Sequence, residues 1–289
     1  MTLDYERIKN WSFADIRHDY GKRDCILYAL SIGLGSDPID PSQLQFVYEK
    51  ALLAFPTMSS ILCYPGFWMQ DPSTGIDWVR LVHGEQHSVW HKPLPAKGVL
   101  TGRTHISHVI DKGADKGALV IAERNMYDQE DSLVATIRQT TFCRGDGGFG
   151  KGDTPPVALP AVPERPCDHQ YEVTIAPNAA ILYRLNADPN PLHIDPDTAK
   201  AAGFERPILH GLCTYGHAAR AILHTCCDSD PSRLYRFDSR FSAAVYPGET
   251  LVCDVWREGP LDIHFQVRAK ERNVIVLSHG YAVLRDAAS

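Results

Sequence analysis

The 289-residue sequence has no long hydrophobic run. No apolar stretch reaches the roughly 18 residues that a membrane-spanning helix requires, so we expect no association with a membrane. The first residues, MTLDYERIKNW, include acidic side chains and no apolar segment, which is not the pattern of a secretory signal. The last residues, DAAS, are not a peroxisomal tripeptide of the S-K-L type. We therefore expect a cytoplasmic protein.

Patterns that bind metals, nucleotides and nucleic acids are also missing. The eight cysteines form no C-x-x-C pair, which predicts reduced, mostly buried thiols. There is no H-E-x-x-H, no P-loop and no G-x-G-x-x-G after a strand, so metal, ATP and nicotinamide chemistry lack support. With a net charge of −6 and no basic stripe carrying interleaved aromatics, the chain is not expected to bind nucleic acid. We expect no bound cofactor.

The most informative part of the chain is the segment from Tyr183 to Gly211. It places a carboxylate, a carboxamide and an imidazole at Asp188, Asn190 and His193. Proline follows both Asp188 and Asn190, which favours a stiff loop in extended or turn geometry. An acid and a base on a stiff loop suit general acid/base chemistry on one bound water. This pattern indicates a catalytic loop.

A plain structural interpretation accounts for the same residues. D-x-N-P is ordinary turn chemistry, because Asp and Asn accept hydrogen bonds from nearby backbone amides. The residues that follow are typical of a short helix that is capped by Asp195 or Asp197 and ends at Gly203. Residue types alone do not choose between the two interpretations.

The wider segment resembles a known family. The run Y-R-L-x-x-D-x-N-P-L-H-x-D-P, followed by A-G-F-x-x-P-I-L-H-G-L-C-T, closely resembles the signature of the 2-enoyl-CoA hydratase 2 family, the MaoC-like (R)-specific hydratases. The resemblance implies that Asp188 and His193 activate the water that adds to a trans-2-enoyl-CoA, and that Asn190 helps to order the site. The family usually has a small hydroxyl residue and Gly just before the Asp, where this chain has Asn186 and Ala187.

A second chemical element is expected where a helix begins near Gly211. An apolar stripe at helical spacing follows this residue, at Leu212, Tyr215, Ala219, Ile222 and Leu223. Hydration develops negative charge on the thioester oxygen, and backbone amides at a helix N-terminus stabilise such charge. The resemblance implies that the Gly211 amide is an oxyanion donor; the alternative is a plain helix cap.

Coenzyme A carries several phosphates, whereas the whole chain is acidic, so any attraction must be local. The cations nearest to the catalytic segment in the sequence are Lys200, Arg206 and Arg220. They are candidates for phosphate contacts, and the alternative for each is a solvated surface charge.

The chain also predicts a duplicated architecture. Residues 144–168 are rich in Gly and Pro and lack hydrophobic periodicity, which marks a domain boundary. On each side a helix is followed by a run of antiparallel-type strands. We expect helices at 25–34, 177–187 and along the apolar stripe, and strands at 83–90, 99–110, 118–127, 133–142, 170–175, 233–241, 250–256, 261–269 and 274–284. We expect one hydrophobic core in each half.

This order predicts an α+β protein, and the resemblance implies a double hot-dog fold, in which a curved antiparallel sheet wraps a central helix twice. The domains are expected at 1–150, a non-catalytic half that accommodates the acyl chain; at 151–168, a linker; and at 169–289, the catalytic half. The unusually apolar segment 55–70 is either a wall of the acyl pocket or ordinary core.

The resemblance implies a hydro-lyase of fatty-acid β-oxidation that interconverts trans-2-enoyl-CoA and (3R)-3-hydroxyacyl-CoA and acts as a homodimer. A hot-dog acyl-CoA thioesterase and a non-catalytic acyl-CoA-binding protein are the alternatives. A metal site would draw on His193, Asp195, His210 and His217, but the spacing does not favour one, and His210 is expected to be structural. The other histidines, including His83, His87, His105 and His108, are given no role.

Overall fold

The computed structural model describes residues 3–186 and 188–286. Its ten strands form one antiparallel sheet in the order β1-β3-β4-β5-β2-β7-β10-β9-β8-β6. The elements of the first half are α1 (Tyr5–Lys9), β1 (Ile16–Tyr20), α2 (Lys22–Ser31), α3 (Pro41–Leu44), β2 (Leu81–Trp90), β3 (Gly98–Asp111), β4 (Ala118–Tyr127) and β5 (Leu133–Cys143). Those of the second half are β6 (His169–Thr174), α4 (Ala179–Tyr183), α5 (Pro196–Ala201), α6 (Gly211–Cys226), β7 (Leu234–Phe241), β8 (Thr250–Arg257), β9 (Asp262–Ala269) and β10 (Val274–Leu284).

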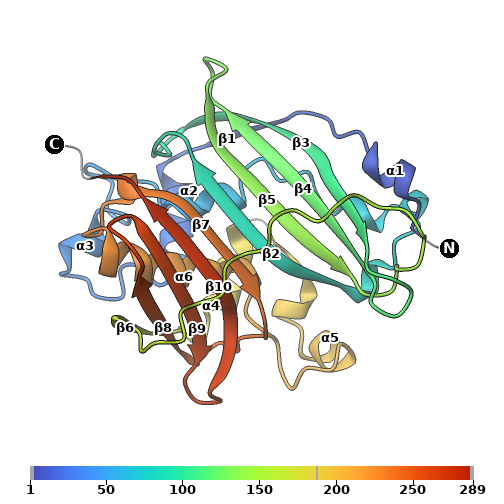
Figure 1. Cartoon of the computed structure of the whole chain (residues 1–289). Helices are drawn as coiled ribbons and strands as arrows, with labels where there is room; N and C mark the ends of the chain where they lie inside the picture. The colour runs from blue at the N-terminus through green and yellow to red at the C-terminus, as the bar shows by residue number, and fades with distance from the viewer. Residues whose placement is uncertain (1–2, 187, 287–289) are drawn as a thin grey trace.

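Each half of the sheet curves around one helix. Figure 1 shows β1–β5 and β6–β10 as two parts of the sheet, with α2, α4 and α6 behind them. α6 is buried along most of its length, from Cys213 to Leu223, as its apolar stripe predicts. α2 buries Cys25, Tyr28 and Ala29. The structure is the α+β double hot-dog that the sequence resemblance implies.

The expected helix at 25–34 is displaced toward the N-terminus. α2 starts at Lys22 and ends at Ser31, and its C-terminal turn is followed by Gly33 with φ of +79°. A left-handed residue cannot continue an α-helix, and glycine adopts this conformation without steric cost. The glycine therefore ends the helix earlier than the apolar pattern in the sequence, which extends to residue 34.

The two halves share one core, so the expectation of two separate cores was wrong. Strand β2 of the first half pairs with β7 of the second, with Glu85 opposite Arg240. The Tyr215 hydroxyl of α6 donates to the Phe237 carbonyl at 2.6 Å, on β7 at this junction. One cluster of buried residues extends across both halves. A side chain at Gly216 would lie 2.5 Å from Ile32, so the two central helices pack against each other without an intervening layer.

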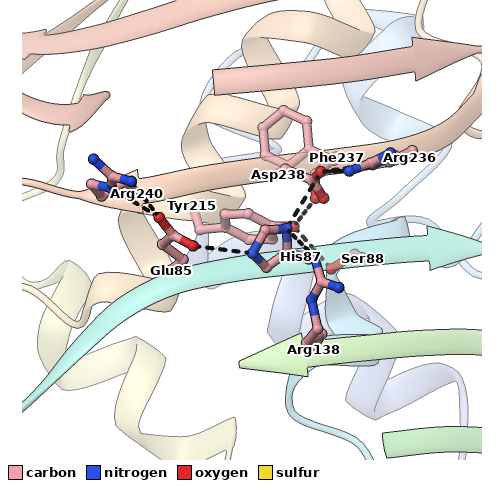
Figure 2. Close-up of polar contacts among 9 residues, drawn as sticks. All are labelled: Glu85, His87, Ser88, Arg138, Tyr215, Arg236, Phe237, Asp238 and Arg240. Atoms are coloured by element: carbon pink, nitrogen blue, oxygen red, sulfur yellow. Dashed lines mark hydrogen bonds and ion pairs between the residues drawn. The ribbon is translucent and has the colours of Figure 1, made fainter. Parts of the chain in front are cut away.

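A network of charged side chains lies on the other face of the β2–β7 junction (Figure 2). Asp238 is fully buried, with Arg236 at 2.6 Å and the His87 Nδ1 at 3.4 Å. Arg240 approaches Glu85 at 2.7 Å. Although burial opposes it, the Asp238 and Glu85 carboxylates hold the pKa of His87 above its ordinary value. Because buried charges are costly unless they are paired, the pairing of Asp238 with Arg236 and His87 offsets part of the cost of burying this carboxylate.

Residues 144–168 contain no helix or strand. Asp153 in this segment accepts hydrogen bonds from Tyr5, Lys9 and the Val109 amide of the first half. Arg165 pairs with Glu258 of the second half at 2.9 Å, so the segment is anchored to both halves. Seven of the eight cysteines are buried, Cys167 is half-buried, and all are free thiols, as the sequence predicts. Among the residues that the structure describes, no helix combines the length and apolar character needed to cross a membrane.

Candidate active site

The predicted catalytic loop forms a compact polar site in the second half. Asp188, His193 and His210 each present one side-chain donor atom, and these three atoms lie within 4.8 Å of one another. The Asp188 carboxylate accepts a hydrogen bond from the Asn190 amide at 3.2 Å. The Asn190 carboxamide oxygen accepts from the Leu192 amide at 3.0 Å and caps the short 3-10 helix Pro191–His193. Both turns hold the acid and the base on the same side of the loop.

The tautomer of His193 follows from its hydrogen bond. Its Nδ1 lies 2.8 Å from the carbonyl oxygen of Ile208. A carbonyl oxygen only accepts, so Nδ1 carries the proton and Nε2 keeps a free lone pair. Burial lowers the pKa of His193 below its ordinary value. The imidazole is therefore neutral at pH 7 and can accept a proton at Nε2.

His210 contacts both the His193 ring and the backbone of the loop. Its ring stacks on that of His193, with 3.8 Å between ring centroids, and its Nε2 donates to the backbone carbonyl of Asp188 at 3.2 Å. Burial, together with the neighbouring His193, lowers the pKa of His210 to about 4. A neutral ring held between these partners positions the loop, which agrees with the structural role expected for it.

Helix α6 begins directly after His210. The amides of Cys213 and Thr214 bond to the His210 carbonyl at 3.0 and 3.2 Å. The Gly211 amide precedes this first turn, where helix amides have no intrahelical acceptor. A side chain at this glycine would lie 3.2 Å from the Phe241 ring. The N-terminus of α6 therefore directly follows His210, whose ring stacks on that of His193.

The two residues that depart from the family pattern lie before Asp188. The Asn186 carboxamide donates to the Ser31 hydroxyl and to the Tyr183 carbonyl, both at 3.0 Å. The first of these bonds links the loop to α2 of the other half. Ala187 lies outside the described residues.

The three candidate phosphate-binding cations have different surroundings. Lys200 is exposed on α5, and Arg206 is exposed with its guanidinium 5.1 Å from the centre of the Tyr246 ring. Arg220 is only 8% exposed and donates to the Gly33 carbonyl at 2.6 Å. The interpretation of Arg220 as a phosphate ligand was wrong, because α6 is buried on all sides and turns this side chain into the interface between the halves.

The four residues of the alternative metal site, which the spacing did not favour, do not come together as a set. Asp195 caps α5 by accepting from the Asp197 amide at 3.1 Å, and the buried His217 donates from Nδ1 to the Cys213 carbonyl at 2.9 Å. Of that set only His193 and His210 meet. Together with Asp188 they have the donor types of a divalent-cation site, as well as those of an acid/base site.

The structure places His83, to which the sequence assigned no role, close to the site. The His83 ring, on β2 of the first half, lies 4.5 Å from the Phe241 ring, and Phe241 packs against Gly211. Burial lowers the pKa of His83 to about 4, and the charge of Asp188 opposes this shift. His83 is 105 residues from Asp188 in the chain, so no local pattern connects the two.

His83 also lines a cavity of about 190 Å³ in the first half. Segment 55–70 forms one wall through Tyr64, Pro65, Phe67, Trp68 and Met69. Because the His83 ring contacts that of Phe241, which packs against Gly211, the cavity adjoins the N-terminus of α6. Earlier residues of the same segment, such as Phe55 and Leu62, are core. The first part of the segment is therefore ordinary core, and the later part lines a cavity; that this cavity holds the acyl chain stays a prediction.

The repeated wrapped helix, with an acid/base loop before the second one, defines a MaoC-like double hot-dog protein. Two family descriptions match the chain: "MFE-2 hydratase 2 N-terminal domain" over residues 18–145 and "MaoC like domain" over residues 159–279. Enoyl-CoA hydratase 2, peroxisomal, of Arabidopsis thaliana is 38% identical, over 95% of this chain and 93% of that protein. Probable enoyl-CoA hydratase 2 of Dictyostelium discoideum is also 38% identical, over 98% and 97%.

Solved structures agree. The MaoC-like dehydratase of Phytophthora capsici superposes with a TM-score of 0.87 at 34% identity, over 98% of this chain and 99% of that one. Peroxisomal multifunctional enzyme type 2 of Drosophila melanogaster superposes with a TM-score of 0.81 at 34% identity, over 94% of this chain and 48% of that one. The chain belongs to the MaoC-like enoyl-CoA hydratase 2 family.

Proposed function

We propose that this protein is a hydro-lyase that catalyses the reversible hydration of trans-2-enoyl-CoA to (3R)-3-hydroxyacyl-CoA. The observation that carries the proposal is the placement of the Asp188 and His193 donor atoms within 4.8 Å of each other, next to the N-terminus of α6. Membership of the enoyl-CoA hydratase 2 family supports the same reaction.

The site provides each step of this reaction. A water between Asp188 and His193 loses a proton to the free Nε2 lone pair of His193, and its oxygen bonds to C3 of the enoyl group. The negative charge that reaches the thioester oxygen is stabilised by the Gly211 amide and the helix dipole. A proton then adds at C2 from the same acid/base pair. One water is consumed, no electrons are exchanged, and we propose that no bound cofactor takes part.

The direct test is incubation with crotonyl-CoA, followed as loss of enoyl absorbance. We expect turnover without release of free thiol. Thiol release from a saturated acyl-CoA would instead indicate a thioesterase, and no reaction with either substrate would leave only a binding function.

The stereochemistry of the product provides a sharper test. A water that is held by Asp188 and His193 on one face of the enoyl group, with the thioester oxygen held at Gly211, reaches C3 from that face only. We expect only the (3R)-hydroxyacyl-CoA, detected by coupling to dehydrogenases of known (3R) or (3S) preference. A signal with the (3S) enzyme alone would contradict the assignment of product hand, and a racemic product would contradict a fixed water.

The pH dependence of kcat/KM should reflect the burial of His193. Because the pKa of His193 is lowered from its ordinary value of 6.5, the neutral imidazole that accepts the proton is still the dominant form at pH 6.5. We expect kcat/KM to be constant between about pH 6.5 and 8 and to decline only as the pH falls below the ordinary histidine value. An acidic limb centred above pH 6.5 would show that His193 is not the base.

The remaining expectations from the sequence complete the proposal. We propose that residues 1–150 accommodate the acyl chain, that 151–168 are a linker and that 169–289 catalyse the reaction. Lys200 and Arg206 are proposed to contact the phosphates of coenzyme A, since both are exposed on the segment after the catalytic loop. We also propose a role in β-oxidation, a homodimer and a cytoplasmic location; the buried free thiols support a reducing compartment.

A further inference from the structure

The cavity beside the catalytic loop contains a buried arginine that forms no ion pair with a carboxylate of the described residues. Arg124 lies on β4, is 6% exposed and lines the cavity. One guanidinium nitrogen, Nη2, donates to the Ser60 carbonyl at 2.7 Å, while the buried Nε has no hydrogen-bond partner. Within the described part of the chain, the groups that act on its charge are Cys63 and Tyr64, and neither is a carboxylate.

This arrangement is costly for the protein alone. Removing a cation from water is unfavourable unless an opposite charge or a full set of hydrogen bonds replaces the solvent. Burial lowers the pKa of Arg124 to about 10, which leaves the guanidinium charged at neutral pH. Arg236, by contrast, pairs with the buried Asp238. Arg124 is therefore organised for a partner that the chain does not supply.

The surroundings of Arg124 indicate what that partner is. The Thr104 hydroxyl lines the same cavity and is also buried without a hydrogen-bond partner. Apolar residues also line the cavity: Ile137 belongs to the main core, and Ala122 and Trp68 pack against a second buried cluster that includes Ile8 of α1. A ligand that fits is apolar along its length and ends in a negatively charged hydrogen-bond acceptor.

We propose that the preferred substrate is an enoyl-CoA whose acyl chain ends in a carboxylate, which pairs with Arg124 and accepts a hydrogen bond from Thr104. This inference rests on the proposed function, since it names the acyl group that the hydratase site receives. The cavity adjoins the site through His83, whose ring contacts Phe241 beside Gly211, so an acyl chain whose thioester is held at Gly211 can extend into it. A cavity of about 190 Å³ with an aromatic wall suits a short acyl chain better than the adenine nucleotide of coenzyme A.

The test compares two enoyl-CoA substrates of equal chain length, one ending in a carboxylate and one in a methyl group. We expect the wild-type kcat/KM to be at least about tenfold higher for the carboxylate, the size of a buried hydrogen bond to a charged group. Arg124→Met should lower kcat/KM for the carboxylate substrate by at least about tenfold and leave that for the methyl substrate unchanged or higher. Activity on the methyl substrate then also shows that the variant is folded.

Arg138→Met is the matched control. Arg138 is on the neighbouring strand β5, next to Ile137, which pairs with Arg124. Its side chain lies near His87, on the face of the sheet opposite to that of Arg124. This variant should keep the wild-type ratio of the two substrates. If Arg124→Met does not fold, Thr104→Val provides the second variant, and it should lower the same ratio in the same direction.

Two results would overturn the inference. An unchanged substrate ratio in Arg124→Met would show that no carboxylate pairs with this residue. A weaker inhibition by free coenzyme A in Arg124→Met would show that the anion is a phosphate of the carrier. Calorimetric binding of the saturated carboxylate-terminated acyl-CoA separates this inference from the proposed function: if wild type binds this analogue more tightly than Arg124→Met does but hydrates neither substrate, only the proposed function fails.

Discussion

Asp188→Asn and His193→Ala should each lower kcat by at least about 10²-fold, the contribution that a positioned acid or base makes to catalysis. Asp188→Asn keeps the shape of the side chain but removes its charge, and His193→Ala removes the Nε2 lone pair. KM should change little, because neither change alters the cavity. Steady-state kinetics with crotonyl-CoA and a thermal melt of each variant provide the measurement.

The double variant shows whether the two groups act on one water. If they do, the fold-decrease in kcat of the double variant should be far smaller than the product of the two single fold-decreases, because groups that act as a unit are not additive. Asp195→Asn is the matched control: this carboxylate lies in the same segment but caps α5, a role that Asn also fulfils, so kcat should stay near wild type. Near-wild-type turnover by either single variant would remove that residue from the mechanism.

Gly211→Pro should lower kcat by about 10²–10³-fold, the loss measured when one oxyanion donor is removed elsewhere. Proline lacks the backbone N–H, yet it is favoured at the first position of a helix. His210 has φ −57° and ψ 135°, a conformation that readily precedes proline. The substitution therefore removes the donor at a position where α6 tolerates it.

Gly211→Ala separates the effect of losing the amide donor from the effect of adding a side chain. Both variants add a Cβ about 3.2 Å from the Phe241 ring, and only proline removes the amide hydrogen. We expect Gly211→Ala to keep most of the activity, provided that the ring shifts by a few tenths of an ångström. Equal losses in the two variants would mean that crowding against Phe241, and not the lost N–H, explains the effect.

The sequence alone determined the features that depend on neighbours along the chain. Alternating and helical apolar patterns predicted β4 and β8–β10 within a few residues, because the side chains of one element share its periodicity. The catalytic loop was equally local: Asp188 and His193 are five residues apart, and the two prolines and the Asn190 cap restrict the loop between them. Residue types and spacing were enough to predict that Asp188 and His193 come together.

Only the tertiary structure decided how the two halves meet. Pairing of β2 with β7 merges the expected two cores into one, and it brings His83 to Phe241 across the junction. A charged residue in a sequence does not show which way its side chain turns: Arg220 was expected at the surface and is buried against Gly33, while Arg124 faces the cavity. Both outcomes depend on what packs against the element from a distant part of the chain, and periodicity within one element contains no information about that partner.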